Sequence, residues 1–324
     1  MTINTDHRSE QLKIGLVQIA PVWLNKTATI EKALGYISEA AAQDCDLVVF
    51  GEAFLPGYPF WLELTGGAEF NSPVQKAIHS HYMSNAIDIE AGDLQPFCDV
   101  AKQKQIAIYL GAIERPGDRG GHSLYCSMVY VSAEGVIGSV HRKLMPTYEE
   151  RLTWSPGDGH GLRTHKLGAF TVGGLNCWEN WMPLPRAALY GMGEDLHVAI
   201  WPGGEHNTHD ITRFIAKEHR GFCVSVSSIM RPDDFPQNTP HLDLILENIN
   251  KEFLANGGSC VAAPDGSWVL EPQVAQEGLF FAEIDHRSVR EERQNFDPVG
   301  HYSRPDVTQL SINRARQSTI KISD

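Results

Sequence analysis

The 324-residue sequence is poor in basic residues and has no long apolar run. Its 27 lysines and arginines are outnumbered by 40 aspartates and glutamates, which gives a formal net charge of −13. This sign disfavours nucleic-acid binding and docking on anionic membranes, because both need a basic surface. No stretch approaches the roughly 18 apolar residues of a membrane span, and the polar start MTINTDHRSEQ does not resemble a signal peptide.

The sequence also lacks paired cysteines and the common nucleotide and serine-hydrolase motifs. Its six cysteines include no C-x-x-C pair, so we expect no disulfide framework and a reducing, cytoplasmic location. The motifs G-x-S-x-G, G-x-x-x-x-G-K-[ST] and strand-linked G-x-G-x-x-G are absent. The histidine clusters at 79–81 and 206–209 do not match H-E-x-x-H, so no metal site is predicted.

Apolar runs alternate with amphipathic stretches along the chain, a pattern typical of α/β proteins. The expected strands are 12–19, 47–50, 106–113, 128–131, 136–140, 169–176, 198–201, 222–229, 260–263, 267–271 and 279–284. The expected helices are 29–43, 94–105, 185–190, 208–219 and 241–255, and the stretch between 50 and 94 reads as irregular. Because no linker divides the chain, we predict one domain over 1–290 and a polar tail over 291–324 at a subunit interface.

Three polar residues stand where a predicted strand ends and a loop begins: Glu52, Lys143 and Cys177. Such positions converge in α/β proteins, where ligands bind outside the carboxyl ends of strands. Taken singly, a loop glutamate or lysine is usually solvated and a cysteine is usually a small core residue. The prolines after Cys177 predict a sharp strand-to-helix turn with an exposed thiol, whose pKa a neighbouring ammonium would lower.

Four segments of the chain resemble the nitrilase superfamily of carbon–nitrogen hydrolases, and its nitrilase branch in particular. They are FGEAFLPGYPFW at 50–61, HRKLMPTYEERLTWSPGDG at 141–159, GGLNCWENWMPL at 173–184 and DPVGHYSRPDV at 297–307. The resemblance implies a four-layer α-β-β-α sandwich. It also implies that Cys177 is the nucleophile, Glu52 the general base, Lys143 the third catalytic residue, and Glu150 an additional glutamate near the lysine.

The same resemblance implies the reaction and its partners. A small organic nitrile would be hydrolysed to a carboxylic acid and ammonia through a thioimidate and a thioester on Cys177, without a cofactor. The protein would be a homo-oligomer built from dimers, with spirals or filaments as an open alternative. Aromatic residues in or beside the motif loops could form an apolar pocket, and Tyr58, Trp178 and Trp201 are the predicted substrate-binding residues.

Two other functions stay open at this point. An amidase or N-carbamoyl hydrolase of the same superfamily would use the same three residues, although the segment CWEN favours a nitrilase. A non-catalytic assembly protein on this scaffold is the alternative from another class, and it would have no need for Glu52, Lys143 and Cys177 together. The sequence does not indicate whether the nitrile is aliphatic, aromatic or arylacetic.

Overall fold

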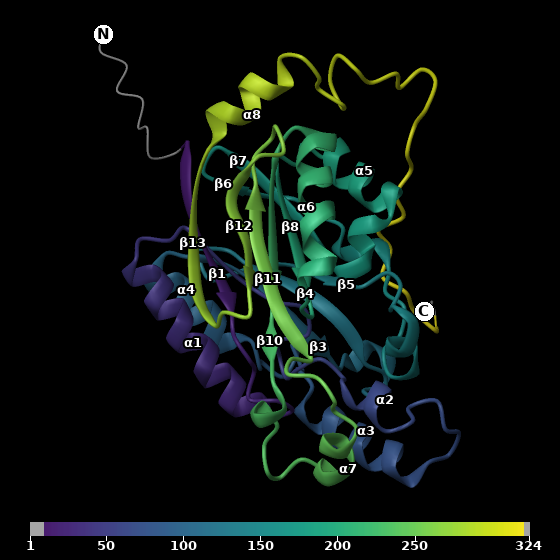
Figure 1. Cartoon of the computed structure of the whole chain (residues 1–324). Coiled ribbons are helices and arrows are strands. Elements are labelled where there is room, and N and C mark those ends of the chain that lie inside the picture. Colours follow the sequence, from purple (N-terminus) through teal and green to yellow (C-terminus); the bar gives the residue numbers. More distant parts are fainter. Residues whose placement is uncertain (1–9, 321–324) are drawn as a thin grey trace.

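The structure, a computed structural model, describes residues 10–320 and has two β-sheets between two layers of helices (Figure 1). The first sheet has the order β13-β1-β2-β3-β4-β5. Its strands are β1 (Gln11–Gln18), β2 (Leu47–Phe50), β3 (Ala107–Glu114), β4 (Tyr125–Val131), β5 (Ile137–Arg142) and β13 (Gly278–Asp285).

The second sheet has the order β10-β11-β9-β8-β7-β6, with β12 paired to β11. Its strands are β6 (His165–Leu167), β7 (Phe170–Asn176), β8 (Leu196–Trp201), β9 (Phe222–Ser227), β10 (Ile229–Met230), β11 (Ala255–Ala262) and β12 (Trp268–Val274). Strands β1, β2 and β3 are parallel neighbours in one sheet, and β7, β8 and β9 are parallel neighbours in the other. Parallel neighbours need crossover connections, which the helices supply.

Helices α1 (Lys26–Ala42) and α4 (Gln95–Lys104) cover the first sheet, and α5 (Pro183–Gly191) and α6 (Glu205–His219) cover the second (Figure 1). The remaining helices are α2 (Trp61–Leu64), α3 (Pro73–Asn85), α7 (Leu242–Glu247) and α8 (His286–Arg293). The short 3-10 helices are η2 (Gly117–Arg119), η3 (Tyr148–Leu152), η4 (Gly159–Gly161), η5 (Cys177–Trp181) and η6 (Pro232–Asp234).

Side-chain alternation in the strands explains why both faces of a sheet are apolar. In β2, Leu47 and Val49 belong to the core between the sheets, whereas Val48 and Phe50 pack in the core beneath α1 and α4. Successive side chains of a strand point to opposite faces, so a short continuous apolar run suits a strand covered on both sides. The predicted α-β-β-α sandwich is confirmed by this arrangement.

Two sequence-based predictions of elements are wrong. The stretch between 50 and 94 contains α2 and α3 and is not wholly irregular; α3 has only Ile78 and Tyr82 fully buried, so its apolar pattern is sparse. The helix expected over 241–255 ends at Glu247. Asn248 and Asn250 follow, and asparagine side chains compete for backbone hydrogen bonds and so disfavour helix continuation.

The chain after α8 forms no further helix or strand up to residue 320. It runs down the side of the molecule past α5, drawn in yellow in Figure 1. Ile312 packs against the apolar cluster that contains Leu189 of α5. Among residues 10–320, no helix combines the length and the apolar character needed to cross a membrane.

Candidate active site

Three of the predicted residues meet where strands of both sheets end. Glu52 lies two residues after β2, Lys143 directly follows β5, and Cys177 directly follows β7. The Lys143 Nζ atom lies 2.9 Å from Glu52 Oε1. The Cys177 Sγ atom and one carboxylate oxygen each from Glu52 and Glu150 lie within 4.8 Å of one another. The sandwich therefore gathers a thiol, an ammonium and two carboxylates into one buried cluster.

The two carboxylates differ in how they are held. Glu150 Oε2 accepts hydrogen bonds from Lys143 Nζ at 2.7 Å and from the Thr147 backbone N–H at 2.6 Å. Its other oxygen accepts from the Tyr58 hydroxyl at 3.0 Å. Among the described residues, the buried oxygens of Glu52 have no hydrogen-bond partner beyond the ion pair with Lys143. Glu150 is thus fixed as a support, whereas Glu52 has an oxygen free to accept a proton.

Cys177 stands on a strained turn at the start of η5. Its φ angle of 47° lies in the left-handed region, which costs a residue other than glycine about 1 kcal/mol or more. The Glu179 carboxylate holds this turn by accepting from the backbone N–H groups of Asn176 at 2.9 Å and Leu144 at 2.6 Å. Because Leu144 follows Lys143, Glu179 ties the cysteine turn to the loop that carries the lysine.

The prediction of an exposed thiol is wrong, since Cys177 is only 3% exposed. It packs in the apolar cluster formed by Trp201 of β8 and the inner face of α6. Burial and the charge of Glu52 raise the pKa of the Cys177 thiol well above its usual range, and Lys143 offsets only part of this increase. The resting group is therefore a thiol, which needs a base within reach before it can attack.

Glu52 has the acid–base properties that such a base requires. Burial is the main reason that its pKa rises to about 7, and the charge of Glu150 adds to the effect while Lys143 opposes it. Burial alone would lower the pKa of Lys143, but the negative charge that Cys177 carries as a thiolate and the charges of the two glutamates hold that pKa well above its usual value. Lys143 therefore stays cationic, and Glu52 can exchange a proton near neutral pH.

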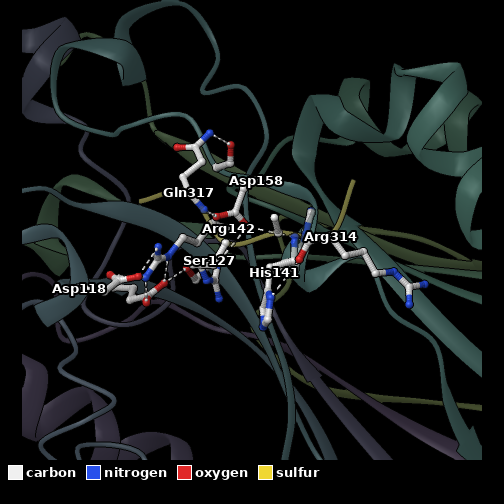
Figure 2. Close-up of polar contacts among 12 residues, drawn as sticks. Asp118, Ser127, His141, Arg142, Asp158, Arg314 and Gln317 are labelled. Carbon is white, nitrogen blue, oxygen red and sulfur yellow. Dashed lines mark hydrogen bonds and ion pairs between the residues drawn. The ribbon is translucent and has the colours of Figure 1, made fainter. Parts of the chain in front are cut away.

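A buried ion pair anchors the end of β5, next to Lys143. The guanidinium of Arg142 donates to Glu114 from Nε at 2.9 Å and from Nη2 at 2.7 Å. Ser127 also donates to Glu114, at 2.7 Å, and Asp118 accepts from Arg142 at 3.1 Å. Figure 2 shows Arg142 reaching Asp118 close to Ser127. This paired fork of hydrogen bonds fixes the strand end from which the lysine side chain projects.

The predicted pocket residues lie in three different environments. Tyr58 lines a small cavity against Glu52, together with Phe60 and Met230. Trp178 is 55% exposed at the surface. Trp201 is fully buried in the same cluster as Cys177, and its indole N–H donates to Ser225 Oγ at 3.2 Å. Their contacts with substrate remain predictions.

Several residues of the site carried no recognised signal in the sequence. Trp154 lies in the quoted segment at 141–159 and places its ring 5.5 Å from Lys143 Nζ. Asn180 lies in the quoted CWEN segment, yet its buried contacts with β8 become visible only in the fold. Glu114 is an isolated charge at the end of an apolar strand, and only its pairing with Arg142 explains its burial.

The donor atoms of Glu52, Glu150 and Cys177 are close enough together to suggest a metal site. The Lys143 ammonium contacts both carboxylates, at 2.9 and 2.7 Å, and already supplies a positive charge there. A metal ion would have to displace this fixed cation, so the arrangement suits acid–base and nucleophilic chemistry better than metal binding.

Comparison with known proteins agrees with this geometry. Among curated proteins, "Nitrilase 2" from an unknown prokaryotic organism is 32% identical over 97% of this chain and 96% of its own length. "Aliphatic nitrilase" from Sinorhizobium fredii (strain HH103) is 34% identical, over 96% of this chain and 98% of its own length. "Aliphatic nitrilase" from Rhodococcus rhodochrous is 32% identical, over 95% of this chain and 84% of its own length.

Solved structures share the fold at lower identity. A carbon-nitrogen hydrolase from Helicobacter pylori G27 superposes with a TM-score of 0.69, at 19% identity over 93% of this chain and 97% of that one. Nit3 of Saccharomyces cerevisiae, a member of branch 10 of the nitrilase superfamily, gives 0.66 at 19% identity, over 90% and 97% of the two chains. The sequence pattern of the carbon-nitrogen hydrolase family matches residues 13–294 of this chain. The chain belongs to that family.

Proposed function

We propose that the protein is a nitrilase, which converts a nitrile R–C≡N and two water molecules into the acid R–COOH and ammonia. The observation that carries the proposal is the buried contact of a thiol, a carboxylate with a free oxygen and an ammonium, at Cys177, Glu52 and Lys143. The names of the relatives that are 32–34% identical over nearly the whole chain support the choice of substrate class.

The first half of the reaction forms a bond between sulfur and carbon. Glu52 takes the proton of the Cys177 thiol, and the thiolate attacks the nitrile carbon. The nitrile nitrogen gains negative charge as the C≡N bond loses one bond order, and the proton held by Glu52 passes to it. The product is a neutral thioimidate on Cys177.

The second half releases the two products. Glu52 activates one water molecule, which adds to the thioimidate carbon; the resulting tetrahedral species expels ammonia and leaves a thioester. A second water molecule attacks the thioester in the same way, and the C–S bond breaks to give the carboxylic acid and the Cys177 thiol. If the tetrahedral species expels the thiol in place of ammonia, the product is an amide.

Lys143 is the proposed electrostatic partner of these steps. Its ammonium stabilises the charge that develops on the nitrogen or oxygen of the substrate, helped by the backbone N–H of Trp178, the residue after Cys177. Glu150 holds the ammonium in place at 2.7 Å. Tyr58 borders the cavity next to Glu52 and is the best placed of the three proposed substrate contacts, the other two being Trp178 and Trp201.

We also propose self-association through the face formed by η5, the start of α5 and α6. Large apolar side chains gather there at 36–65% exposure: Trp178, Trp181, Met182, Leu184 and Phe214. Large apolar side chains gathered on exposed neighbouring elements are typical of protein–protein contacts. Sedimentation velocity of a Leu184→Asp variant tests it, since a monomer is expected if this face joins copies and an unchanged assembly refutes it.

The predicted location and tail remain proposals. All six cysteines are free and buried, which suits a reducing, cytoplasmic compartment. The tail over 291–324 is proposed to border a subunit interface, although its stretch at 314–317 contacts this chain's own loop at 157–160.

Ammonia release from matched pairs of a nitrile and its own amide tests the activity. Pairs from the aliphatic, aromatic and arylacetic classes are compared, with the Cys177→Ala protein as the blank. Ammonia from nitriles with little from amides is the expected result. Ammonia from amides alone makes the protein an amidase, and release that persists in the Cys177→Ala protein removes the thiol from the mechanism.

A further inference from the structure

We propose that Glu194, His197 and Asn180 form a buried relay that fixes the peptide group between Cys177 and Trp178, and with it the strained turn that carries the Cys177 sulfur. None of the three lines the small cavity next to Glu52, so they act as positioning residues. The inference rests on the proposed role of Cys177 as nucleophile. All three side chains belong to residues that are fully buried.

The amide of Asn180 has only one orientation that fits its surroundings. Its nitrogen donates to the carbonyl oxygens of Cys177 at 2.8 Å and Leu175 at 3.2 Å. Its oxygen faces His197 Nε2 at 2.8 Å. Reversing the amide would place its oxygen against two carbonyl oxygens, which cannot donate. Nε2 of His197 must therefore carry a hydrogen.

The other ring nitrogen of His197 faces a carboxylate. Nδ1 lies 3.0 Å from both oxygens of Glu194, so one additional proton is shared between the two side chains. Burial raises the pKa of the Glu194 carboxyl, which the charge of His197 opposes. The nearby ring of His219, 6.4 Å from that of His197, adds no positive charge because burial lowers its pKa to about 3.

The relay acts on the nucleophile through a single peptide group. The Cys177 carbonyl and the Trp178 N–H belong to one planar unit, so fixing the oxygen fixes the direction of the hydrogen on the other side. The plane of this peptide group also fixes the ψ angle of Cys177, the residue that carries the proposed nucleophile. A carbonyl that accepts a hydrogen bond also makes the attached N–H a stronger donor.

The strained backbone of Cys177 needs hydrogen bonds that hold it in place. A residue at φ 47° relaxes unless the surrounding structure holds it. Glu179 grips the turn at its beginning, through the Asn176 N–H, whereas Asn180 grips the carbonyl of the nucleophile itself. Arg186 in turn holds the Asn180 backbone carbonyl at 2.7 Å, so the end of the turn cannot move away.

Two substitutions of His197 distinguish its hydrogen bond to Asn180 from its contribution to packing in the core. In His197→Gln the amide nitrogen reaches the position of Nε2 and keeps the bond to Asn180. In His197→Asn the shorter side chain places its amide nitrogen only at the position of Nδ1, so the hydrogen bond to Asn180 is lost. We expect His197→Asn to lower kcat about 10- to 100-fold with KM nearly unchanged, and to slow alkylation of Cys177 by iodoacetamide to a similar extent. His197→Gln should restore most of both rates.

The readouts distinguish the relay from a purely structural effect. Alkylation is assigned to Cys177 by mass spectrometry, and rates are divided by the folded fraction from thermal unfolding. Equal rates per folded molecule in His197→Asn, His197→Gln and the wild type would overturn the relay. If His197→Asn does not fold, Asn180→Asp replaces it: this isosteric change removes the donor to the Cys177 carbonyl and predicts the same loss. Rapid wild-type alkylation without nitrile turnover refutes the proposed function and leaves the relay test intact.

Discussion

The turn that carries Cys177 is flanked by two polar groups of opposite character. On its reactive side, made of Glu52, Lys143 and Glu150, two carboxylates share one ammonium and Glu52 lacks hydrogen bonds. On its support side, made of Glu194, His197 and Asn180, each side chain has a hydrogen-bond partner. A buried polar group without hydrogen bonds lowers the stability of the folded protein, but it is available to exchange a proton. A buried network in which every group is hydrogen-bonded holds its side chains in one arrangement.

The largest difference in kcat should appear between two single variants, in which one glutamate of the reactive side or one of the support side is replaced by glutamine. Glu52→Gln removes the proposed proton acceptor, and we expect kcat to fall about 10²- to 10⁴-fold without loss of thermal stability. Glu194→Gln should lower kcat less than about tenfold. A glutamine amide can donate to a neutral His197, which then keeps its hydrogen bond to Asn180. Steady-state kinetics and thermal unfolding of both variants measure the contrast. Equal losses of kcat in the two variants would remove the distinction between the sides.

The second test removes the cation of the reactive side. Lys143→Met nearly keeps the length of the side chain but leaves the carboxylates of Glu52 and Glu150 buried close together without a cation. Breaking a buried ion pair in this way costs about 3–5 kcal/mol of unfolding free energy. Urea denaturation of the wild type and the variant gives the difference, and a cost below about 1 kcal/mol would mean that water already reaches this cluster.

The third test changes the pH dependence of the reactive side. In the proposed mechanism Glu52 must be ionised to accept the thiol proton. Because burial raises its pKa to about 7, kcat/KM should fall as the pH drops below about 7. The charge of Glu150 contributes to this increase in pKa. Glu150→Gln should therefore move the acid limb of the profile to lower pH, by about one unit. A shift to higher pH would contradict the assignment of that limb to Glu52.

The smallest effect concerns a contact outside both sides of the turn. Asp158 accepts from the Gln317 backbone N–H at 2.9 Å and pairs with Arg316 at 3.0 Å, and Figure 2 shows Gln317 beside Asp158. Burial alone would raise its pKa, but these contacts and the His160 N–H hold the pKa of Asp158 below its usual value. Asp158→Asn should lower the free energy of unfolding by about 1 kcal/mol. It should also release the segment of the tail around Arg316 and Gln317 from the core.

Limited trypsin digestion measures that release. Cleavage after Arg316 should become faster in Asp158→Asn, while the thermal midpoint of the core and the rate of Cys177 alkylation stay near those of the wild type. Wild-type digestion kinetics in the variant would show that Ile312 and its apolar neighbours hold the tail without help from Asp158.

Much of this architecture was readable from the sequence. Apolar runs such as 47–50 and 169–176 predict strands covered on both faces, and each is followed by a residue of the site. The sequence does not predict helix α3, because only Ile78 and Tyr82 are fully buried in its 13 residues. The helix predicted over 241–255 is too long, because a weak apolar pattern continues past Glu247 although two asparagines interrupt it.

The sequence by itself determined the composition of the reactive cluster: Glu52, Lys143 and Cys177 each follow a strand, and the family motifs around them identify Glu150. Only the tertiary structure decided their protonation and their support. Burial, which depends on both sheets and on α6, makes Cys177 a thiol and raises the pKa of Glu52. The support side joins Asn180 to residues of β8 and the loop before it, 14 or more positions away, a contact created by sheet pairing that local patterns do not encode.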